Sequence, residues 1–111
     1  MSDTLSPTRL RDLNDQFRQT LRGGTIVLTA GIMALGPVAQ ANILRVVAAF
    51  DQFSPDNDPY GEHDFGAVEY DGQRCFWKID AYDFTLAMHS PDALDPSVTR
   101  RVLTIMLADE Y

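Results

Sequence analysis

Acidic side chains and one histidine gather near the middle of the chain, in the stretch FSPDNDPYGEHDFG at residues 53–66. Asp56, Asp58 and Asp64 carry the hard oxygen ligands that Ca²⁺ and Mg²⁺ prefer. Proline and glycine within the stretch predict a loop rather than a helix or strand. One hypothesis is therefore a divalent-cation site at these three carboxylates. The competing interpretation is a solvated loop in which Asp side chains cap turns.

The EF-hand pattern tests the metal hypothesis position by position. Counted from Asp56, the loop places Asp58 third and Gly61 sixth, as that pattern requires. Tyr60 then stands fifth and Ala67 twelfth, where the pattern needs an oxygen ligand and a bidentate Glu. The EF-hand interpretation therefore fails, and the only cofactor that the sequence leaves open is a divalent cation held in some other way.

His63 is the most specific candidate for chemistry. The strand pairing derived below, continued by two residues, places His63 opposite Asp80, with Glu62 beside it. A carboxylate in that position would orient and charge an imidazole for general acid–base catalysis, and a metal-assisted phosphoesterase or nuclease could use such a group. The alternative is a structural His63–Asp80 pair that ties the loop to the sheet. His89, beside Ser90-Pro91, is predicted to be an exposed turn residue.

The elements that must position this loop begin with an amphipathic helix. Ser6-Pro7 predicts its start, with Ser6 as the N-cap and Pro7 in the first turn. Polar residues, Arg18 among them, fall on the other faces, and Gly23-Gly24 predicts its end. Apolar residues recur at helical spacing, namely Leu10, Leu13, Phe17 and Leu21.

A strand and a second helix are predicted next. Residues 25–29 are β-branched and apolar on both faces, which predicts a strand at the centre of the sheet. Residues 30–36 are interpreted as a turn, because Gly31 and Gly36 interrupt them. Pro37 then fits the first turn of a helix with a broad apolar face that extends to about Phe50.

Asp71-Gly72 predicts a two-residue β-hairpin, because a type I′ turn needs positive φ at both central positions. The strands would be residues 64–70 and 73–82, with Tyr70 opposite Gln73 and Phe65 opposite Lys78. In that register Gly66 faces Trp77 and leaves room for the indole. The face predicted to enter the core consists of Val68, Cys75, Trp77 and Ile79. Cys75 is thus a core thiol, and as the chain's single cysteine it forms no internal disulfide.

Two more elements complete the prediction. Alternation over Phe84, Leu86 and Met88 indicates a further strand. Asp95-Pro96 predicts the start of a last helix that runs nearly to Tyr111. Its buried stripe would be Val98, Val102, Ile105 and Met106. The expected fold is a single α+β domain over residues 1–111, with a small mainly antiparallel sheet covered on one face by about three helices.

The charge distribution indicates what such a domain could bind. Of the net charge of −7, residues 51–95 carry −9, from eleven Asp and Glu against Arg74 and Lys78. This field disfavours direct binding of nucleic acid and attracts a basic protein surface, with exposed aromatic side chains as anchors. The binding residues that we predict are Asp56, Asp58, Tyr60, Glu62, His63 and Asp64.

The start of the chain, MSDTLSPTRLRDL, lacks the basic and apolar regions of a secretory signal, so we expect a cytoplasmic protein. The longest apolar runs are shorter than the roughly 20 residues that span a bilayer, so no membrane association is predicted. The sequence leaves open whether the C-terminal helix packs internally or against a second copy, so a homo-oligomer remains an alternative.

Three segments, LTAGIMALGP (28–37), DNDPYGEHDFG (56–66) and TRRVLTIMLADEY (99–111), resemble a family of short uncharacterised bacterial proteins, a domain of unknown function. The resemblance implies a setting on plasmids and other mobile DNA and no particular chemistry. It supports an accessory or counter-defence role that acts through a basic protein surface. We therefore favour a non-enzymatic interaction protein, with a metal-assisted hydrolase built on His63 and its carboxylates as the alternative.

Overall fold

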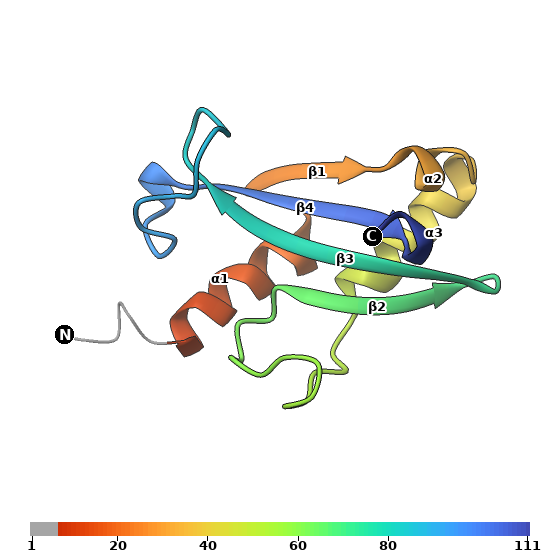
Figure 1. The fold of residues 1–111 in the computed structure, drawn as a ribbon, viewed down its shortest axis with the longest axis horizontal. Helices are drawn as coiled ribbons and strands as arrows, with labels where there is room; N and C mark the ends of the chain where they lie inside the picture. The colour runs from red at the N-terminus through yellow and green to blue at the C-terminus, as the bar shows by residue number, and fades with distance from the viewer. Residues whose placement is uncertain (1–6) are drawn as a thin grey trace.

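A computed structural model describes residues 7–111, in which three α-helices and four β-strands follow one another along the chain (Figure 1). The elements are α1 (Pro7–Thr20), β1 (Gly24–Leu28), α2 (Ala30–Met33), α3 (Pro37–Ala48), β2 (Phe65–Tyr70), β3 (Gln73–Tyr82) and β4 (Arg100–Leu107), with 3₁₀ turns η2 (Pro96–Val98) and η3 (Ala108–Glu110). The sheet has the order β1-β4-β3-β2, with β1 parallel to β4 and the other two pairings antiparallel. The predicted α+β class with a mainly antiparallel sheet is confirmed.

The first helix forms where its apolar spacing predicts it. Phe17 is buried against the sheet, and Leu21 packs beside it. The helix ends at Thr20, and both Leu21 (φ 57°) and Gly23 (φ 97°) adopt the left-handed conformation that turns the chain into β1. The predicted N-cap, Ser6, lies outside the described residues.

The predicted strand at residues 25–29 is confirmed as β1, but its predicted central position is wrong. Within the described part of the chain, β1 is an edge strand that pairs only with β4. Its sequence predicts a central strand because both of its faces are apolar. In the structure, Ile26 and Leu28 pack on the core, while Val27 is 39% exposed. The segment interpreted as a turn contains the single-turn helix α2, and Pro37 begins α3 as predicted.

The hairpin has the predicted register, from Phe65 opposite Lys78 to Tyr70 opposite Gln73. Asp71 (φ 53°) and Gly72 (φ 78°) form its turn with positive φ at both positions. Gly66 packs on Trp77 so closely that an added Cβ would lie 2.5 Å from the indole nitrogen. The predicted core face is confirmed, because Val68, Cys75, Trp77 and Ile79 are all buried.

The predicted C-terminal helix is wrong, because residues 100–107 form strand β4. Asp95 does cap a helical turn, accepting a hydrogen bond from the Ser97 backbone N–H at 2.9 Å, but that turn ends at Val98. β4 lies between β1 and β3, where both of its faces are covered, so its apolar run has no clear alternation. A buried run of this kind fits a helical stripe and a central strand equally well.

The strand predicted over Phe84, Leu86 and Met88 is also wrong, because this segment is an exposed loop. The Asp83 carboxylate organises it, accepting hydrogen bonds from the Thr85 backbone N–H at 3.1 Å and the Thr85 hydroxyl at 2.7 Å. Alternating side chains in this loop therefore point into solvent rather than into a sheet face. His89 is exposed, as predicted.

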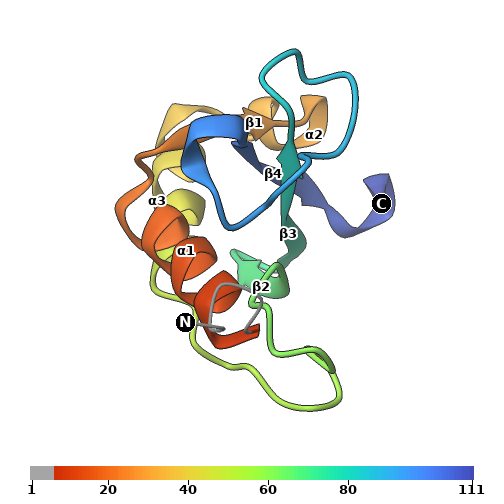
Figure 2. The same cartoon turned by 90° about the vertical axis from the view of Figure 1, so that its left-hand side faces the viewer.

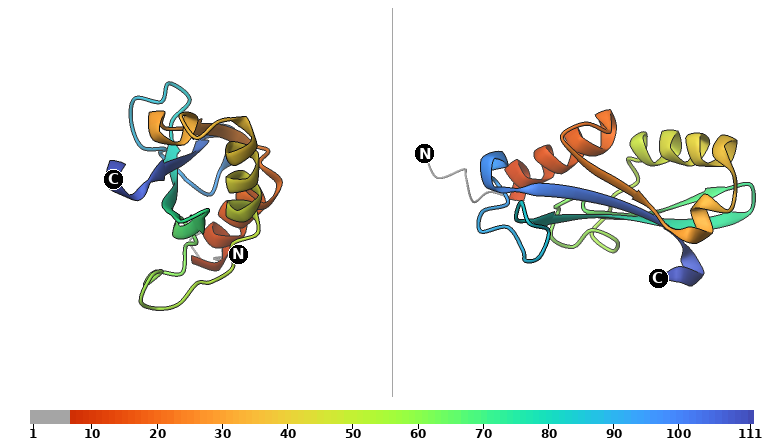
Figure 3. Two further views of the ribbon diagram at one scale, coloured as in Figure 1. Left: turned by 90° about the vertical axis from the view of Figure 1, so that its right-hand side faces the viewer. Right: turned by 90° about the horizontal axis from the view of Figure 1, so that it is seen from above.

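Helices α1 and α3 lie side by side on one face of the sheet (Figures 2 and 3). The core lies between them and the sheet, around the fully buried Trp77, Ile43, Leu103 and Ile105. On the opposite face, the rings of Phe65, Phe76 and Tyr111 contact one another. The segment that joins α3 to β2, residues 49–64, projects beyond the end of α1 and carries the acidic loop, residues 51–64 (Figures 1 and 2). Among the described residues, no helix has the length and apolar character needed to cross a membrane.

Candidate functional site

His63 lies at the base of the acidic loop and contacts Asp15 and Asp58 rather than Asp80. Its Nδ1 lies 2.9 Å from Asp15 Oδ1, and its Nε2 lies 3.5 Å from Asp58 Oδ2. The predicted His63–Asp80 pair is therefore wrong. His63 has a φ of 54°, which takes it out of the strand before β2 begins at Phe65 and turns its ring toward α1. Asp80 instead pairs with Lys78 at 3.3 Å.

The imidazole of His63 also stacks on the ring of Phe53. The two ring centroids are 3.6 Å apart and the rings are nearly parallel, at 5°. Phe53 in turn packs on the core and meets Phe50 edge-on at 4.9 Å. Because Phe53 and His63 stand near the two ends of the loop, their stack closes the loop at its base.

Arg18 extends the His63–Asp15 contact into the core. Its guanidinium is 1% exposed, and its Nη2 lies 3.0 Å from Asp15 Oδ1. Its Nη1 donates to the backbone carbonyls at the end of α3, those of Val47 (2.9 Å), Ala48 (3.1 Å) and Phe50 (2.9 Å). The guanidinium carbon lies 5.1 Å from the Trp77 ring centroid, a cation–π distance.

The prediction that Arg18 lies on an exposed face of the first helix is therefore wrong, and the sequence held one signal for its role. The helix that begins at Pro37 ends in Ala-Ala-Phe. No glycine follows to form a C-cap motif whose backbone N–H groups would donate to the last carbonyls of the helix. Such a helix end needs donors from elsewhere, and Arg18 supplies them. Asp15, Arg18 and His63 together join α1, the end of α3 and the loop.

Asp58 is a structural residue of the loop. Its side chain is 7% exposed, and its Oδ1 accepts hydrogen bonds from the backbone N–H groups of Glu62 (3.2 Å) and His63 (3.3 Å). Asn57 adds two bonds, from the Ser54 N–H and to the Gln52 carbonyl, both at 2.9 Å. These contacts fix the loop so that Asp56 and Tyr60 face solvent, with Tyr60 78% exposed.

The remaining loop carboxylates, Glu62 and Asp64, line a hollow of about 340 Å³ together with Asp80. Asn14 is buried at its wall, donating to the Glu62 carbonyl and accepting from Arg101 Nε, both at 2.9 Å. Burial raises the pKa of Glu62, and the carboxylates of Asp64 and Asp58 raise it further. Burial also raises the pKa of Asp64, with Asp58 and Asp80 adding to the effect, while a backbone hydrogen bond and His63 oppose it.

The three predicted metal ligands do not converge. Asp56 is exposed, Asp58 turns toward His63, and Asp64 lines the hollow. Between residues 7 and 111, no three His, Cys, Asp or Glu side chains come close enough together to hold a metal ion. The arrangement thus offers a fixed, acidic loop surface and a carboxylate-lined hollow.

The fold and the site together define a small α+β protein with an anchored acidic loop. A family model described as "Protein of unknown function (DUF3768)" matches residues 28–110, so the chain belongs to that family. The match begins at Leu28, the last residue of β1, continues through η3 and includes the whole acidic loop. No curated protein and no solved structure matched the chain.

Proposed function

We propose that this protein is a non-enzymatic interaction module whose acidic loop, residues 51–64, docks on a basic surface of another protein. The observation that carries the proposal is the anchoring of this loop. His63, stacked on Phe53 and bonded to Asp15, fixes the base, while Tyr60 and Asp56 face solvent. A loop held in one conformation loses little entropy on binding, which favours affinity.

Charge and side-chain type support a basic partner. Residues 51–73 contain seven Asp and Glu and neither Lys nor Arg. Such a field speeds association with a positive surface and repels nucleic acid. An exposed tyrosine surrounded by carboxylates is a typical anchor at a protein interface. Of the predicted binding residues, Asp56 and Tyr60 would touch the partner, and Asp58 and His63 would hold the loop.

An accessory or counter-defence role on mobile DNA is a narrower form of this proposal. Its support is the genomic setting implied by the family resemblance, together with a charge that would compete with nucleic acid for a basic groove. In that role the protein would act in the cytoplasm and bind the DNA- or RNA-binding surface of another protein.

Site-specific photocrosslinking tests the docking surface. A benzophenone amino acid placed at Tyr60 should crosslink one partner in the native host, and the same group at Val38, 73% exposed on α3, should not. Asp56→Lys should weaken recovery of that partner, and the crosslink should decline with added salt. Asp109→Lys is the matched charge control, because Asp109 is exposed in η3 and is not part of the acidic loop. Equal crosslinking from both positions, or recovery unaffected by Asp56→Lys, would contradict the proposal.

The alternative, a metal-assisted hydrolase, makes a different prediction. It requires binding of Ca²⁺, Mg²⁺, Mn²⁺ or Zn²⁺, which calorimetric titration measures directly. Heat of binding that disappears in Asp64→Asn, with turnover of a phosphodiester substrate, would favour the hydrolase over the interaction module.

A further inference from the structure

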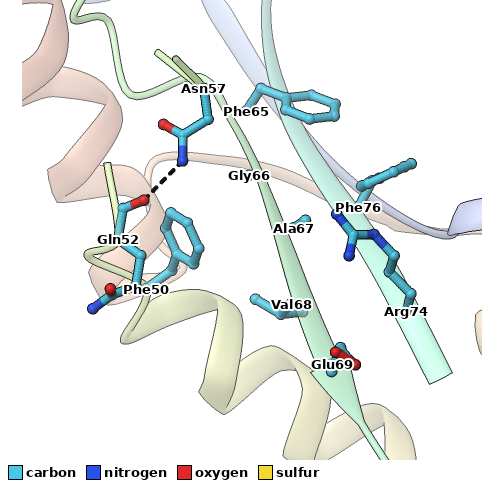
Figure 4. Close-up of a pocket in the computed structure, with 10 residues that line it drawn as sticks. All are labelled: Phe50, Gln52, Asn57, Phe65, Gly66, Ala67, Val68, Glu69, Arg74 and Phe76. Atoms are coloured by element: carbon cyan, nitrogen blue, oxygen red, sulfur yellow. Dashed lines mark hydrogen bonds between the residues drawn. The ribbon is translucent and has the colours of Figure 1, made fainter. Parts of the chain in front are cut away.

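The free edge of β2 is the part of the sheet nearest the acidic loop. Among the strands of residues 7–111, β2 is the last of the sheet and pairs with β3 alone. A groove of about 530 Å³ follows this edge (Figure 4). Phe50, Gln52 and Asn57 lie on one side of the strand, and Phe65, Phe76 and Arg74 lie on the other (Figure 4).

This edge lacks three of the devices that usually prevent strand addition, and Glu69 is the one charged residue of β2. Natural edge strands carry Pro, Lys or a β-bulge, which stop another chain from pairing with them. The β2 sequence FGAVEY contains neither Pro nor Lys, and its register with β3 runs without interruption from Phe65 to Tyr70. At its middle are Gly66 and Ala67, whose small size lets another backbone approach.

The two sides of β2 differ in chemistry. Val68 points to the helix side, where Phe50 lies, so a side chain added there would meet these two apolar groups. Gln52 and Asn57 border them on the same side. Phe65, Ala67 and Glu69 point to the other face, next to Phe76. An added strand would therefore place alternate residues against an apolar wall and against a wall that ends in Glu69.

Charge indicates which strand would fit. The segment 51–73, which supplies most of the groove lining, has seven carboxylates and no basic residue. Glu69 is the one of these that lines the groove, while Asp51, Asp56 and Asp64 are next in the chain to lining residues. Arg74 is the one basic residue that lines the groove, and its guanidinium carbon lies 5.7 Å from the Phe76 ring centroid. A segment that alternates apolar and basic residues would suit the apolar side chains of the groove and the carboxylates that flank it.

We propose that the partner binds as an extended segment of alternating apolar and basic residues, which adds to β2 as a fifth strand. This inference rests on the proposed function and names the form of the partner. Main-chain hydrogen bonds to β2 would supply affinity, and the two walls would supply selectivity.

Synthetic peptides test strand addition directly. The probe is a Val-Lys alternating peptide of about eight residues, long enough to cover β2. Its first control is a Val-Glu peptide, and its second is the Val-Lys peptide with alternate amides N-methylated. The second control keeps charge and composition but cannot pair with a strand. Amide NMR spectra of the protein report where each peptide binds, and fluorescence anisotropy reports affinity.

We expect the Val-Lys peptide to shift the amide signals of residues 65–70 and to bind at least about tenfold more tightly than the N-methylated peptide, which loses several main-chain hydrogen bonds. Glu69→Lys should weaken binding, and Asp109→Lys, the same charge change outside the groove, should not. The Val-Glu peptide should leave all signals unchanged.

Three outcomes would overturn strand addition. One is equal binding of the Val-Lys and N-methylated peptides. Another is a set of shifted signals confined to the loop around Tyr60. The third is concentration-dependent self-association of the protein with shifts at residues 65–70, which would indicate that β2 pairs with a second copy. If a partner crosslinks at Tyr60 while any of these is observed, the proposed function stands and only this inference fails.

Discussion

His63 Nδ1 lies 2.9 Å from Asp15 Oδ1, although 48 positions separate the two residues in the chain. Asp15 also accepts a hydrogen bond from Arg18, so one carboxylate joins an exposed loop to a buried guanidinium. The loop is therefore fixed by contacts to the first helix rather than by contacts within the sheet.

Replacing His63 should loosen the loop. Asn tolerates the positive φ of this position but cannot stack on Phe53, so His63→Asn isolates the lost side-chain contacts. We expect faster amide hydrogen exchange over residues 53–64 and a loss of roughly 1–2 kcal/mol in the free energy of unfolding. His89→Asn, at the exposed histidine, is the matched control. Unchanged exchange in the loop of the His63 variant would contradict the anchoring role.

Replacing Arg18 should destabilise the whole protein. Arg18→Met keeps much of the side-chain volume but leaves three carbonyls at the end of α3 and the Asp15 carboxylate without their donor. Urea denaturation should show a loss of roughly 3–5 kcal/mol, the usual cost of breaking a buried ion pair. Arg11→Met removes an exposed pair with Asp12 at 3.8 Å and should change stability by less than about 0.5 kcal/mol. A similar small change at Arg18 would show that water replaces it.

Adding a methyl group at Gly66 should disturb Trp77. The new Cβ would lie 2.5 Å from the indole nitrogen, so Gly66→Ala must move the ring, at a cost of roughly 1–3 kcal/mol. Because Trp77 is the chain's only tryptophan, its fluorescence maximum reports this movement. Gly61→Ala is the control, because a Cβ added there meets no atom within 4 Å. Its cost, about 1–2 kcal/mol, comes only from the positive φ of this position. An unshifted maximum in Gly66→Ala would contradict the packing.

Replacing Asp64 should stabilise the protein near neutral pH. Burial raises the pKa of Asp64 in the folded state, so the folded protein binds a proton more readily than the unfolded chain. The free energy of unfolding therefore falls as the pH rises from the pKa of Asp64 in the unfolded chain to its higher pKa in the folded protein. Above that folded-state pKa, the charged carboxylate destabilises the fold. Asp64→Asn removes that penalty, and its advantage at pH 7 should disappear as the pH falls below about 4.

Asp95 supplies the opposite sign as a control. Hydrogen bonds from the Ser97 hydroxyl and backbone N–H lower the pKa of Asp95, so its charged form stabilises the fold. Asp95→Ala should therefore be less stable than the parent protein at pH 7, and the difference should shrink as acid protonates Asp95 in the parent. Thermal unfolding across pH 3–7 measures both variants. The same pH trend in both would contradict the assignment of opposite pKa shifts.

The parts of the fold that could be predicted from sequence are those set by neighbouring residues. Asp71-Gly72 determines a hairpin turn by itself, and the turn then fixes every pair up to Phe65 and Lys78. Extending that register to His63 failed because a single residue with positive φ ends the strand, and such a conformation leaves no mark in the sequence around it. The loop itself was thus predicted, but with the wrong partner for its histidine.

The errors in the second half of the chain have a different cause. Residues 100–107 are apolar enough for either a helix or a buried strand, and the choice depends on β1 and β3, which offer two free edges to pair with. Arg18 was misplaced for a similar reason, since its acceptors lie about 30 positions further along the chain. Both depend on contacts between distant segments, which periodicity in a single window does not report.

The central place of β4 also bears on how the protein is made. β1 reaches the rest of the sheet only through β4, and Gly24 pairs with Arg101 near the far end of the sequence. A chain emerging from the ribosome can form α1, α3 and the hairpin early, but it cannot join β1 to the hairpin until residues 100–107 have emerged. Until then the edges of β1 and β3 are both unpaired. We therefore expect nascent chains arrested before Arg100 to be recognised by chaperones or proteases. Chains held on the ribosome by an added C-terminal linker, so that Leu107 has emerged, should resist them.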